Sequence, residues 1–476
     1  MKKLFALLLL ILSLLIFQSV IHAQDLDKKV KEIDNVMAEF MKLDQFSGCV
    51  LVAKDGKPFY AKAFGEADKD FHVKNNLKMK FNIGSIGKTF TGTSIMQLAQ
   101  QGKLSVTDPV IKYLPDFPYG DKITIDHLLT HTSGMFNYFA HPDFASKIST
   151  IRSVKDALPL IYDQKLLFDT PGERFSYSNS GIVTLGAVIE AVTGQSYPDY
   201  IQENILKPLG MNDTGINYLD EVVENRATGY EKSASGKPIR NIFRVPPANA
   251  DGGIETTVED MLKFDQALYG EKLLSDEYKK KMFTPFKENY GYCWRISQEN
   301  GRAMIGHGGG APGVSADFRR YIDDKYTIIV LSNYGGAAVA VSRTIEAIIF
   351  DGKYEMPKPT LGEFLLKKMD EKGFDYTIKN FDQLLKENGY TLNSSQLLNT
   401  YGYQLLSEQK VDMAIEVFKL NVRQFPDEAN PYDSLAEAYL AKGDKESAIA
   451  NYKKALQIDP NLPSAKEALE KLTKNP

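Results

Sequence analysis

The stretch Phe81–Thr91 constrains this chain most, because a turn of small residues there runs straight into a helix-forming run. Ser85 stands at the junction and Lys88 follows three positions later, so a helix that begins here places both side chains on one face. Unpaired N–H groups at a helix N-terminus favour negative charge, which suits an alkoxide or oxyanion at Ser85. A nearby ammonium can help to remove the serine proton. The stretch is compatible with a serine nucleophile, but taken alone it fits a capping serine beside a solvated lysine better, because the pattern is short and its residues are common.

The length, composition and net charge of the chain limit the kinds of protein and of partner to expect. The 476 residues give room for two or more domains, and 43% hydrophobic with 25% charged residues is typical of a soluble globular protein. The formal net charge of -4 gives no reason to expect nucleic acid or an anionic membrane as a partner.

The N-terminus has the layout of a secretory signal. Lys2 and Lys3 precede an apolar run, Leu4–Phe17, and Ala23 ends the polar stretch that follows. The apolar run is short for a membrane span. We therefore predict that residues 1–23 are a signal peptide and that the mature chain is secreted or periplasmic with no stable membrane span. An uncleaved anchor is the alternative.

The two cysteines, Cys49 and Cys293, leave two possibilities open. They can pair as a disulfide in an oxidising compartment. They can also be two buried, unpaired thiols, because each lies in a strand-like segment.

Several segments have the pattern of antiparallel strands. Residues 46–64 predict a β-hairpin around a turn at 54–58. Later strands are predicted over residues 290–296, 303–305, 316–322 and 326–331. The turns between them are short, which indicates antiparallel neighbours. A helix over 339–350 is expected to close this domain.

A short helix is predicted over residues 124–130, and His127 and His131 are four residues apart in this region, a spacing that can bind zinc. However, no glutamate follows His127, as a metalloprotease motif requires, and no third ligand is evident. We interpret both as packing or hydrogen-bonding histidines and predict no metal site.

Two further segments flank predicted helices. Tyr177-Ser178-Asn179 comes shortly before an apolar helix over 182–192. Residues 247–260 begin as a loop of small residues, predicted to cross the sheet closely. They end in a helix start with an acid near the third position.

The C-terminal part changes character after Pro357 and Pro359. A helical stretch over 361–388 is followed by a pattern that recurs 34 positions on, with small and aromatic residues at matching offsets and a proline at the end. The matching pairs are Tyr401 and Leu435, Gly402 and Ala436, Ala414 and Ala448, Phe418 and Tyr452, and Pro426 and Pro460. This period resembles the tetratricopeptide repeat, which implies an interaction surface. A helix over 465–472 is expected to cap the stack.

Three short signals follow one another along the chain: Ser85–Lys88, Tyr177–Asn179 and His307–Gly309. Together, with the first opening a helix and the last ending a strand, they resemble the motifs of the serine β-lactamase and penicillin-recognising hydrolase family. The match is closer to the class C-like branch, in which tyrosine replaces the serine of the middle motif. The resemblance covers roughly residues 46–350. It implies an α+β fold of the β-lactamase/transpeptidase type, an antiparallel sheet flanked by helices plus a helical subdomain.

The resemblance assigns roles to residues of the three motifs. Ser85 would be the acylated nucleophile, and Lys88 would hydrogen-bond it and help to deprotonate it. Tyr177 would act as the base and later as the acid. Asn179 would orient Lys88 and hydrogen-bond the acyl side of the substrate.

The third motif would complete the site. The backbone N–H groups of Ser85 and Gly310 would form an oxyanion hole, with Gly309 beside them on the same strand. His307 would contribute to substrate binding. No metal or organic cofactor is implied.

His307 departs from the β-lactamase pattern, which has lysine at this position. A lysine stays positive and can anchor a substrate carboxylate, whereas a histidine, with a reference pKa of ~6.5, is mostly neutral at pH 7. Histidine does occur here among the family's D-Ala-D-Ala peptidases, esterases and D-amino-acid peptidases. The departure therefore weakens the case for an antibiotic-hydrolysing enzyme.

These observations predict a signal peptide (1–23), a β-lactamase-like hydrolase domain (24–355), a helical linker (356–394) and an all-α repeat domain (395–476). The leading hypothesis is a serine hydrolase that cleaves an ester or amide, including D-amino-acid peptides, through an acyl-enzyme at Ser85. The alternatives are a β-lactamase or D-Ala-D-Ala carboxypeptidase, and an inactive fold that binds a partner through its repeats. The expected partners are a small-molecule or peptide substrate and a protein at the repeats.

Overall fold

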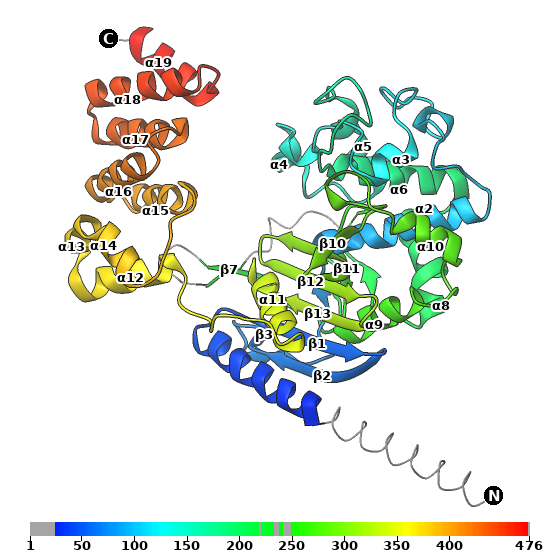
Figure 1. Ribbon diagram of the computed structural model, residues 1–476. Helices are drawn as coiled ribbons and strands as arrows, with labels where there is room; N and C mark the ends of the chain where they lie inside the picture. The colour runs from blue at the N-terminus through cyan, green and yellow to red at the C-terminus, as the bar shows by residue number, and fades with distance from the viewer. Residues whose placement is uncertain (1–23, 219, 233–237, 241–248, 475–476) are drawn as a thin grey trace, which may run out of the picture. The chain divides into compact units, whose positions relative to one another are not determined.

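The computed structural model describes residues 24–218, 220–232, 238–240 and 249–474 (Figure 1). The predicted signal peptide lies outside this part of the chain. The chain forms two compact units, of which the second begins at Lys358 and also contains the segment Lys232–Ile239. Among the described residues, no helix is both long and apolar enough to cross a membrane.

A six-stranded sheet forms the centre of the first unit, and all its neighbouring strands are antiparallel in the order β10-β11-β12-β13-β1-β2. The strands are β1 (Gly48–Lys54), β2 (Lys57–Phe64), β10 (Arg295–Glu299), β11 (Arg302–Ala311), β12 (Val314–Tyr321) and β13 (Tyr326–Ser332). The predicted hairpin is confirmed as β1 and β2. The strands near the end of the first unit join this hairpin in one sheet, since β13 pairs with β1 along its whole length.

Helices cover both faces of this sheet, which explains why its central strands β1, β12 and β13 are buried along almost their whole length. A helix over residues 24–42 and α11 (Ala337–Ile349) pack on one face, against Val50 of β1 and Val330 of β13. Leu51 and Leu331, one position along, belong to the core on the other face. Side chains alternate along a strand, so a register slip of one residue would exchange the two cores.

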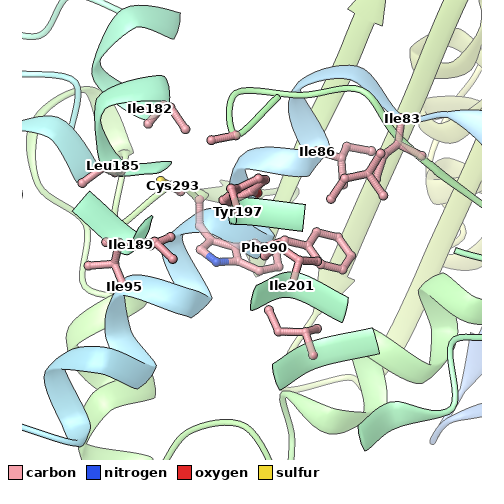
Figure 2. Close-up of a cluster of buried hydrophobic side chains, with 14 of the residues drawn as sticks. Ile83, Ile86, Phe90, Ile95, Ile182, Leu185, Ile189, Tyr197, Ile201 and Cys293 are labelled. Carbon is pink, nitrogen blue, oxygen red and sulfur yellow. The ribbon is translucent and has the colours of Figure 1, made fainter. Parts of the chain in front are cut away.

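The second face packs on α2 (Gly87–Gln100), α6 (Asn179–Thr193) and α9 (Val258–Ala267). Figure 2 shows part of this core, where Phe90 of α2 lies among side chains that include Ile189 of α6. Nearly the whole length of α2 is buried. Packing therefore fixes the position of its first turn.

Shorter elements complete the first unit. They are β3 (Glu66–Asp68), β4 (Val73–Lys74), α3 (Ile125–Leu129), α4 (Phe144–Lys147), α5 (Val154–Tyr162), α7 (Tyr197–Ile201), α8 (Lys207–Leu209) and α10 (Asp276–Met282). Separately, β7 (Tyr230–Lys232) and β8 (Pro238–Arg240) form a two-stranded sheet. A small sheet, β5 (Phe81–Asn82), β9 (Ile254–Thr256) and β6 (Gly215–Ile216), has β9 in its middle. It joins the chain just before Ser85 to the chain just after the loop 249–253.

The predicted strand over 290–296 is wrong for most of its length, because β10 begins only at Arg295. Cys293 has a φ of 63°, a left-handed conformation that a regular strand does not contain. The third motif also differs from its predicted place: His307–Gly309 lies inside β11 rather than at the end of a strand. Its glycines are paired with β12 along the ladder.

Both cysteines are free and buried, so of the two possibilities the unpaired thiols are found. The Cys49 thiol donates a hydrogen bond to the Asn76 carbonyl at 3.3 Å. Burial is the main cause that raises the pKa of each thiol to about 12, so neither has thiolate character near neutral pH.

The second unit is helical, and its last five helices follow the predicted repeat. Its helices are α12 (Leu361–Lys372), α13 (Phe374–Lys379), α14 (Phe381–Glu387), α15 (Gln396–Ser407), α16 (Val411–Gln424), α17 (Ala429–Lys442), α18 (Lys445–Ile458) and α19 (Pro463–Lys474). A methyl group on Gly402 would lie 2.5 Å from the ring of Phe418, and Ala436 and Tyr452 share a core cluster one repeat later. Small residues thus recur where an aromatic side chain of the next helix packs.

One buried ion pair supports the main sheet from α9. Asp265 accepts hydrogen bonds from Arg320 Nε at 2.6 Å and Thr327 Oγ1 at 2.8 Å, and both charged side chains are almost fully buried. We expect Asp265→Ala to lower the free energy of unfolding by about 3–5 kcal/mol, because it leaves a buried guanidinium without its partner. Urea unfolding measures this. Glu203→Ala, which breaks an exposed pair with Lys207, should change stability little, and equal effects from the two variants would contradict the assignment.

Candidate active site

Ser85 lies in a single 3-10 turn, Gly84–Ile86, and α2 begins at the next residue, so the predicted turn-to-helix junction is confirmed. Gly84 has a φ of 49° and donates its N–H to Asn82 Oδ1 at 2.8 Å. The turn is thereby held by the residue that ends β5. The serine side chain is half-buried.

Lys88 is completely buried, so the alternative of a solvated lysine is wrong. Its Nζ donates to Ser85 Oγ at 3.0 Å and to the backbone carbonyl oxygen of Asp251 at 2.5 Å. Two acceptors from different segments thus fix the ammonium against the serine hydroxyl.

The middle motif reaches Lys88 from the start of α6. Lys88 Nζ lies 5.1 Å from the centroid of the Tyr177 ring. Ser178 caps the helix by accepting the N–H of Gly181, and Asn179 is its first residue. The helix therefore begins three residues earlier than predicted, and this start places Tyr177 directly before the cap.

Asn179 is buried and lines the pocket beside Ser85. Its Nδ2 donates to Asn137 Oδ1 at 3.4 Å. Among the described side chains, no hydrogen bond joins Asn179 to Lys88.

Strand β11 brings the third motif against the Ser85 turn. A methyl group on Gly309 would lie 1.8 Å from the Ile83 carbonyl oxygen and 3.2 Å from the Ser85 amide nitrogen. A methyl group on Gly84 would lie 2.7 Å from Gly310 N. Such close backbone approach requires glycine on both sides. It places the amides of Ser85 and Gly310 on neighbouring backbone segments.

A small pocket opens at this point. Its lining residues are Asn82, Gly84, Ser85, Phe139, Asn179, Asp251, Gly252, Gly253, Gly310 and Ala311. Of the predicted site residues, Ser85, Asn179 and Gly310 line it. Lys88 reaches the site through its hydrogen bond to Ser85. The centroid of the His307 ring is 6.5 Å from that of the Tyr177 ring. All three motifs therefore meet in one place.

Asp251 is a site residue that the sequence did not reveal. Its side chain is buried, and its Oδ2 accepts a hydrogen bond from the Tyr138 hydroxyl at 3.2 Å. Burial raises the pKa of Asp251 to about 6, although the nearby Lys88 ammonium opposes that rise. The only signal in the sequence was its position in a loop of small residues, which packs on the Ser85 turn through Gly252.

His127 of α3 and His131, which follows this helix with a φ of 55°, both have structural partners. His127 completes a capping box with Thr124 at the start of α3. His131 lies with its ring 4.2 Å from the Tyr177 ring and bonds to Ser178 and Tyr290. Within the described residues, no group of three or more His, Cys, Asp or Glu side chains is placed to hold a metal ion.

The geometry of the motifs agrees with the comparison to known families. The β-lactamase family profile matches residues 33–350. The chain belongs to the β-lactamase family. A repeat profile described as TPR matches residues 436–469, within the second unit.

Individual relatives support this membership. The chain is 32% identical to penicillin-binding protein 4* of Bacillus subtilis over 357 residues, which cover 69% of this chain and 78% of that protein. A crystal structure of a penicillin-binding protein from Bacillus halodurans is 32% identical with a TM-score of 0.62, covering 66% of this chain and 98% of that one. A D-stereospecific amidohydrolase from Streptomyces is 26% identical with a TM-score of 0.57, covering 65% and 95%. The β-lactamase fold of the first unit, an antiparallel sheet with helices, is therefore as predicted.

Proposed function

We propose that this β-lactamase-family hydrolase cleaves an ester or amide through an acyl-enzyme at Ser85. One observation carries the proposal: a buried ammonium, Lys88 Nζ, donates to Ser85 Oγ at 3.0 Å where that hydroxyl lines a pocket. A capping serine has no need of a buried lysine. Burying an ammonium is costly, and a chain tolerates the cost where the charge is used.

In the proposed acylation, the Tyr177 phenolate takes the proton of Ser85 as Oγ attacks the carbonyl carbon. Negative charge develops on the carbonyl oxygen, and the N–H groups of Ser85 and Gly310 donate to it. The bond to the leaving group then breaks, and the Tyr177 hydroxyl returns the proton, so an alcohol or amine departs. Lys88 Nζ, 5.1 Å from the centroid of the Tyr177 ring, would stabilise the negative charge on Tyr177 in this step.

Deacylation repeats these steps with water. Tyr177 takes a proton from the water, whose oxygen attacks the acyl carbon of the Ser85 ester. The tetrahedral intermediate uses the same two N–H groups, and Tyr177 protonates Oγ as the free serine is restored. The products are a carboxylic acid and the original enzyme.

The substrate class rests on His307. Burial lowers the pKa of His307 to about 3, with Lys88 contributing, so at pH 7 the side chain is neutral and no cation stands where the β-lactamase pattern has lysine. This supports an ester, amide or D-amino-acid peptide over a β-lactam antibiotic. The similarity to a D-stereospecific amidohydrolase agrees with it. Arg295, an exposed cation paired with Gly306 across β10 and β11, is our candidate anchor for a substrate with a free carboxylate.

A fluorophosphonate probe tests the nucleophile and a substrate panel tests the class. We expect one covalent adduct on wild-type protein, located at Ser85 by peptide mass spectrometry, and none on Ser85→Ala. We also expect turnover of a short-chain p-nitrophenyl ester with weak or absent cephalosporin hydrolysis. No adduct on wild type would overturn the proposal. Efficient cephalosporin hydrolysis at neutral pH would replace the substrate class.

Gly309→Ala should lower kcat/KM for that ester by about 10²–10³-fold, the loss expected when one oxyanion donor is displaced. The added methyl would meet the Ile83 carbonyl oxygen at 1.8 Å and push β11 away from the Ser85 turn. Gly308→Ala is the matched control, because its methyl would have no neighbour closer than 3.9 Å. Equal activity of the two variants, with both folded by circular dichroism, would contradict the oxyanion assignment.

For the rest of the chain, the TPR match indicates protein interactions of the second unit.

We propose that the chain is exported, on the strength of its N-terminal sequence alone, and that the hydrolase domain extends to about residue 355. N-terminal sequencing of protein recovered from the periplasm or medium tests the predicted cleavage after Ala23.

A further inference from the structure

Two residues outside the sequence motifs, His131 and Tyr290, join the middle motif to the last one. The N–H of Ser178 donates to His131 Nδ1 at 3.2 Å. His131 Nε2 lies 3.3 Å from the Tyr290 hydroxyl, which lies 2.9 Å from His307 Nε2. His307 Nδ1 lies 2.6 Å from the Gly308 carbonyl oxygen. These four contacts form one unbroken series, the His131–Tyr290–His307 chain.

Backbone groups at its two ends fix the direction of this chain. The Gly308 carbonyl can only accept, so His307 Nδ1 carries a hydrogen; the Ser178 N–H can only donate, so His131 Nδ1 carries none. A neutral His131 then holds its hydrogen on Nε2 and donates to Tyr290. The Tyr290 hydroxyl donates its own hydrogen to His307 Nε2, and every donor meets one acceptor.

A positively charged His307 does not fit these hydrogen bonds. If His307 were protonated on both nitrogens, the Tyr290 oxygen would receive an N–H from each imidazole, and its own hydrogen would have no acceptor in the chain. All three side chains are buried, where an unpaired polar group is costly. A neutral His307 in the Nδ1–H form is the one arrangement that pairs all of them.

The charges around the chain act in the same direction. Lys88 and Arg295 are the positive groups that face it, and Tyr177 and Cys293 are the other titratable neighbours. Burial, then Lys88, holds the pKa of His131 and His307 well below the usual range. Burial also raises the pKa of Tyr290 well above its usual range, so the hydroxyl remains a donor.

We propose that His131 and Tyr290 are positioning residues that hold His307 neutral, as the Nδ1–H tautomer, and fix β11 relative to the Tyr177 motif. Both ring nitrogens of His307 are then used inside the protein. The imidazole offers a substrate neither a positive charge nor a free N–H, and recognition along β11 is left to the backbone. The consequence for turnover rests on the proposed hydrolase function, whereas the tautomer does not.

Nitrogen-15 NMR of histidine-labelled protein tests the tautomers directly, with Tyr290→Phe and Tyr292→Phe compared to wild type. Tyr292 is a matched control because its hydroxyl takes no part in the His131–Tyr290–His307 chain and donates to Asp126 Oδ1 at 2.6 Å instead. In wild type and Tyr292→Phe we expect His307 to be neutral, with hydrogen on Nδ1, from pH 8 to pH 5. In Tyr290→Phe the Nε2 loses its donor, and the His307 signals should shift or begin to titrate.

The activity arm separates this proposal from the hydrolase proposal. Tyr290→Phe should lower kcat for the p-nitrophenyl ester by about 10-fold with KM little changed, and add an acid limb to its pH profile. A charged or Nε2–H His307 in wild type at pH 7 would overturn the proposal even if the ester is hydrolysed. If His131 and His307 have the expected tautomers but the protein hydrolyses no substrate, the proposal for the His131–Tyr290–His307 chain stands and only the hydrolase function is rejected.

Discussion

Ser85→Ala should reduce kcat/KM for a short-chain p-nitrophenyl ester by on the order of 10⁴-fold or more, because no acyl-enzyme can form without Oγ. The loss should appear in kcat, since the pocket and the oxyanion N–H groups remain for binding. Steady-state kinetics against the uncatalysed rate measure it. The fold should survive, because the side chain is half-buried and Lys88 keeps its second acceptor, the Asp251 carbonyl.

Ser94→Ala provides the matched control for this loss. Ser94 lies on α2, the helix that follows the Ser85 turn, is fully buried, and donates to the Phe90 carbonyl at 2.9 Å. Its replacement should cost some stability and leave kcat close to wild type. If Ser85→Ala kept more than a tenth of wild-type turnover, an acyl-enzyme at Ser85 would be the wrong mechanism, and another group would have to hydrolyse the ester.

The parts of the site that the sequence predicts are those held by local structure. Ser85 and Lys88 are three residues apart on a turn that must feed a helix, so their common orientation follows from helical geometry alone. Tyr177 and Asn179 bracket a helix cap, which is also a local signal. The β1–β2 hairpin and the helix pairs of the repeats likewise follow from short-range turns and from small residues that face aromatic ones.

The contacts of Asp251, His131 and Tyr290 in the site could not be predicted because their partners are distant in sequence. Tyr290 meets His131 across 159 residues, and Asp251 meets Lys88 across 163. Nothing in the loop before β10 distinguishes Tyr290 from a strand residue; that segment was in fact predicted as a strand. The turn at Cys293, where a positive φ breaks the strand, has its side chain in the core and donates its N–H to the Leu129 carbonyl oxygen, a partner distant in sequence.

Lys88→Met should abolish ester turnover, by on the order of 10³-fold or more, and should also destabilise the fold in a pH-dependent way. Activity falls because Ser85 loses its donor and the Tyr177 phenolate loses the cation beneath its ring. Stability falls because Asp251 stays buried without the charge that lowers its pKa. The pKa of Asp251 should therefore rise above its wild-type value, so that at neutral pH the folded protein holds this carboxyl in its protonated form.

The sign of the pH dependence follows from proton counting. Burial raises the pKa of Asp251 from 3.8 to about 6, so between these values the folded chain holds a proton that the unfolded chain has released. Unfolding then releases a proton, and the free energy of unfolding falls as pH rises through this window. At about 1.4 kcal/mol per pKa unit, the Asp251 charge costs roughly 3 kcal/mol above pH 6 in wild type. In Lys88→Met the fall should be larger and extend to higher pH.

The double variant Lys88→Met/Asp251→Asn distinguishes the two effects of Lys88. Removing the buried carboxylate should restore stability at pH 7 and flatten its dependence between pH 5 and pH 8, while ester turnover stays absent. Urea unfolding at several pH values, beside ester kinetics, measures both. A double variant as unstable as Lys88→Met would show that Asp251 is not the uncompensated charge. Turnover near wild type in either variant would show that the ammonium at Ser85 Oγ takes no part in the reaction.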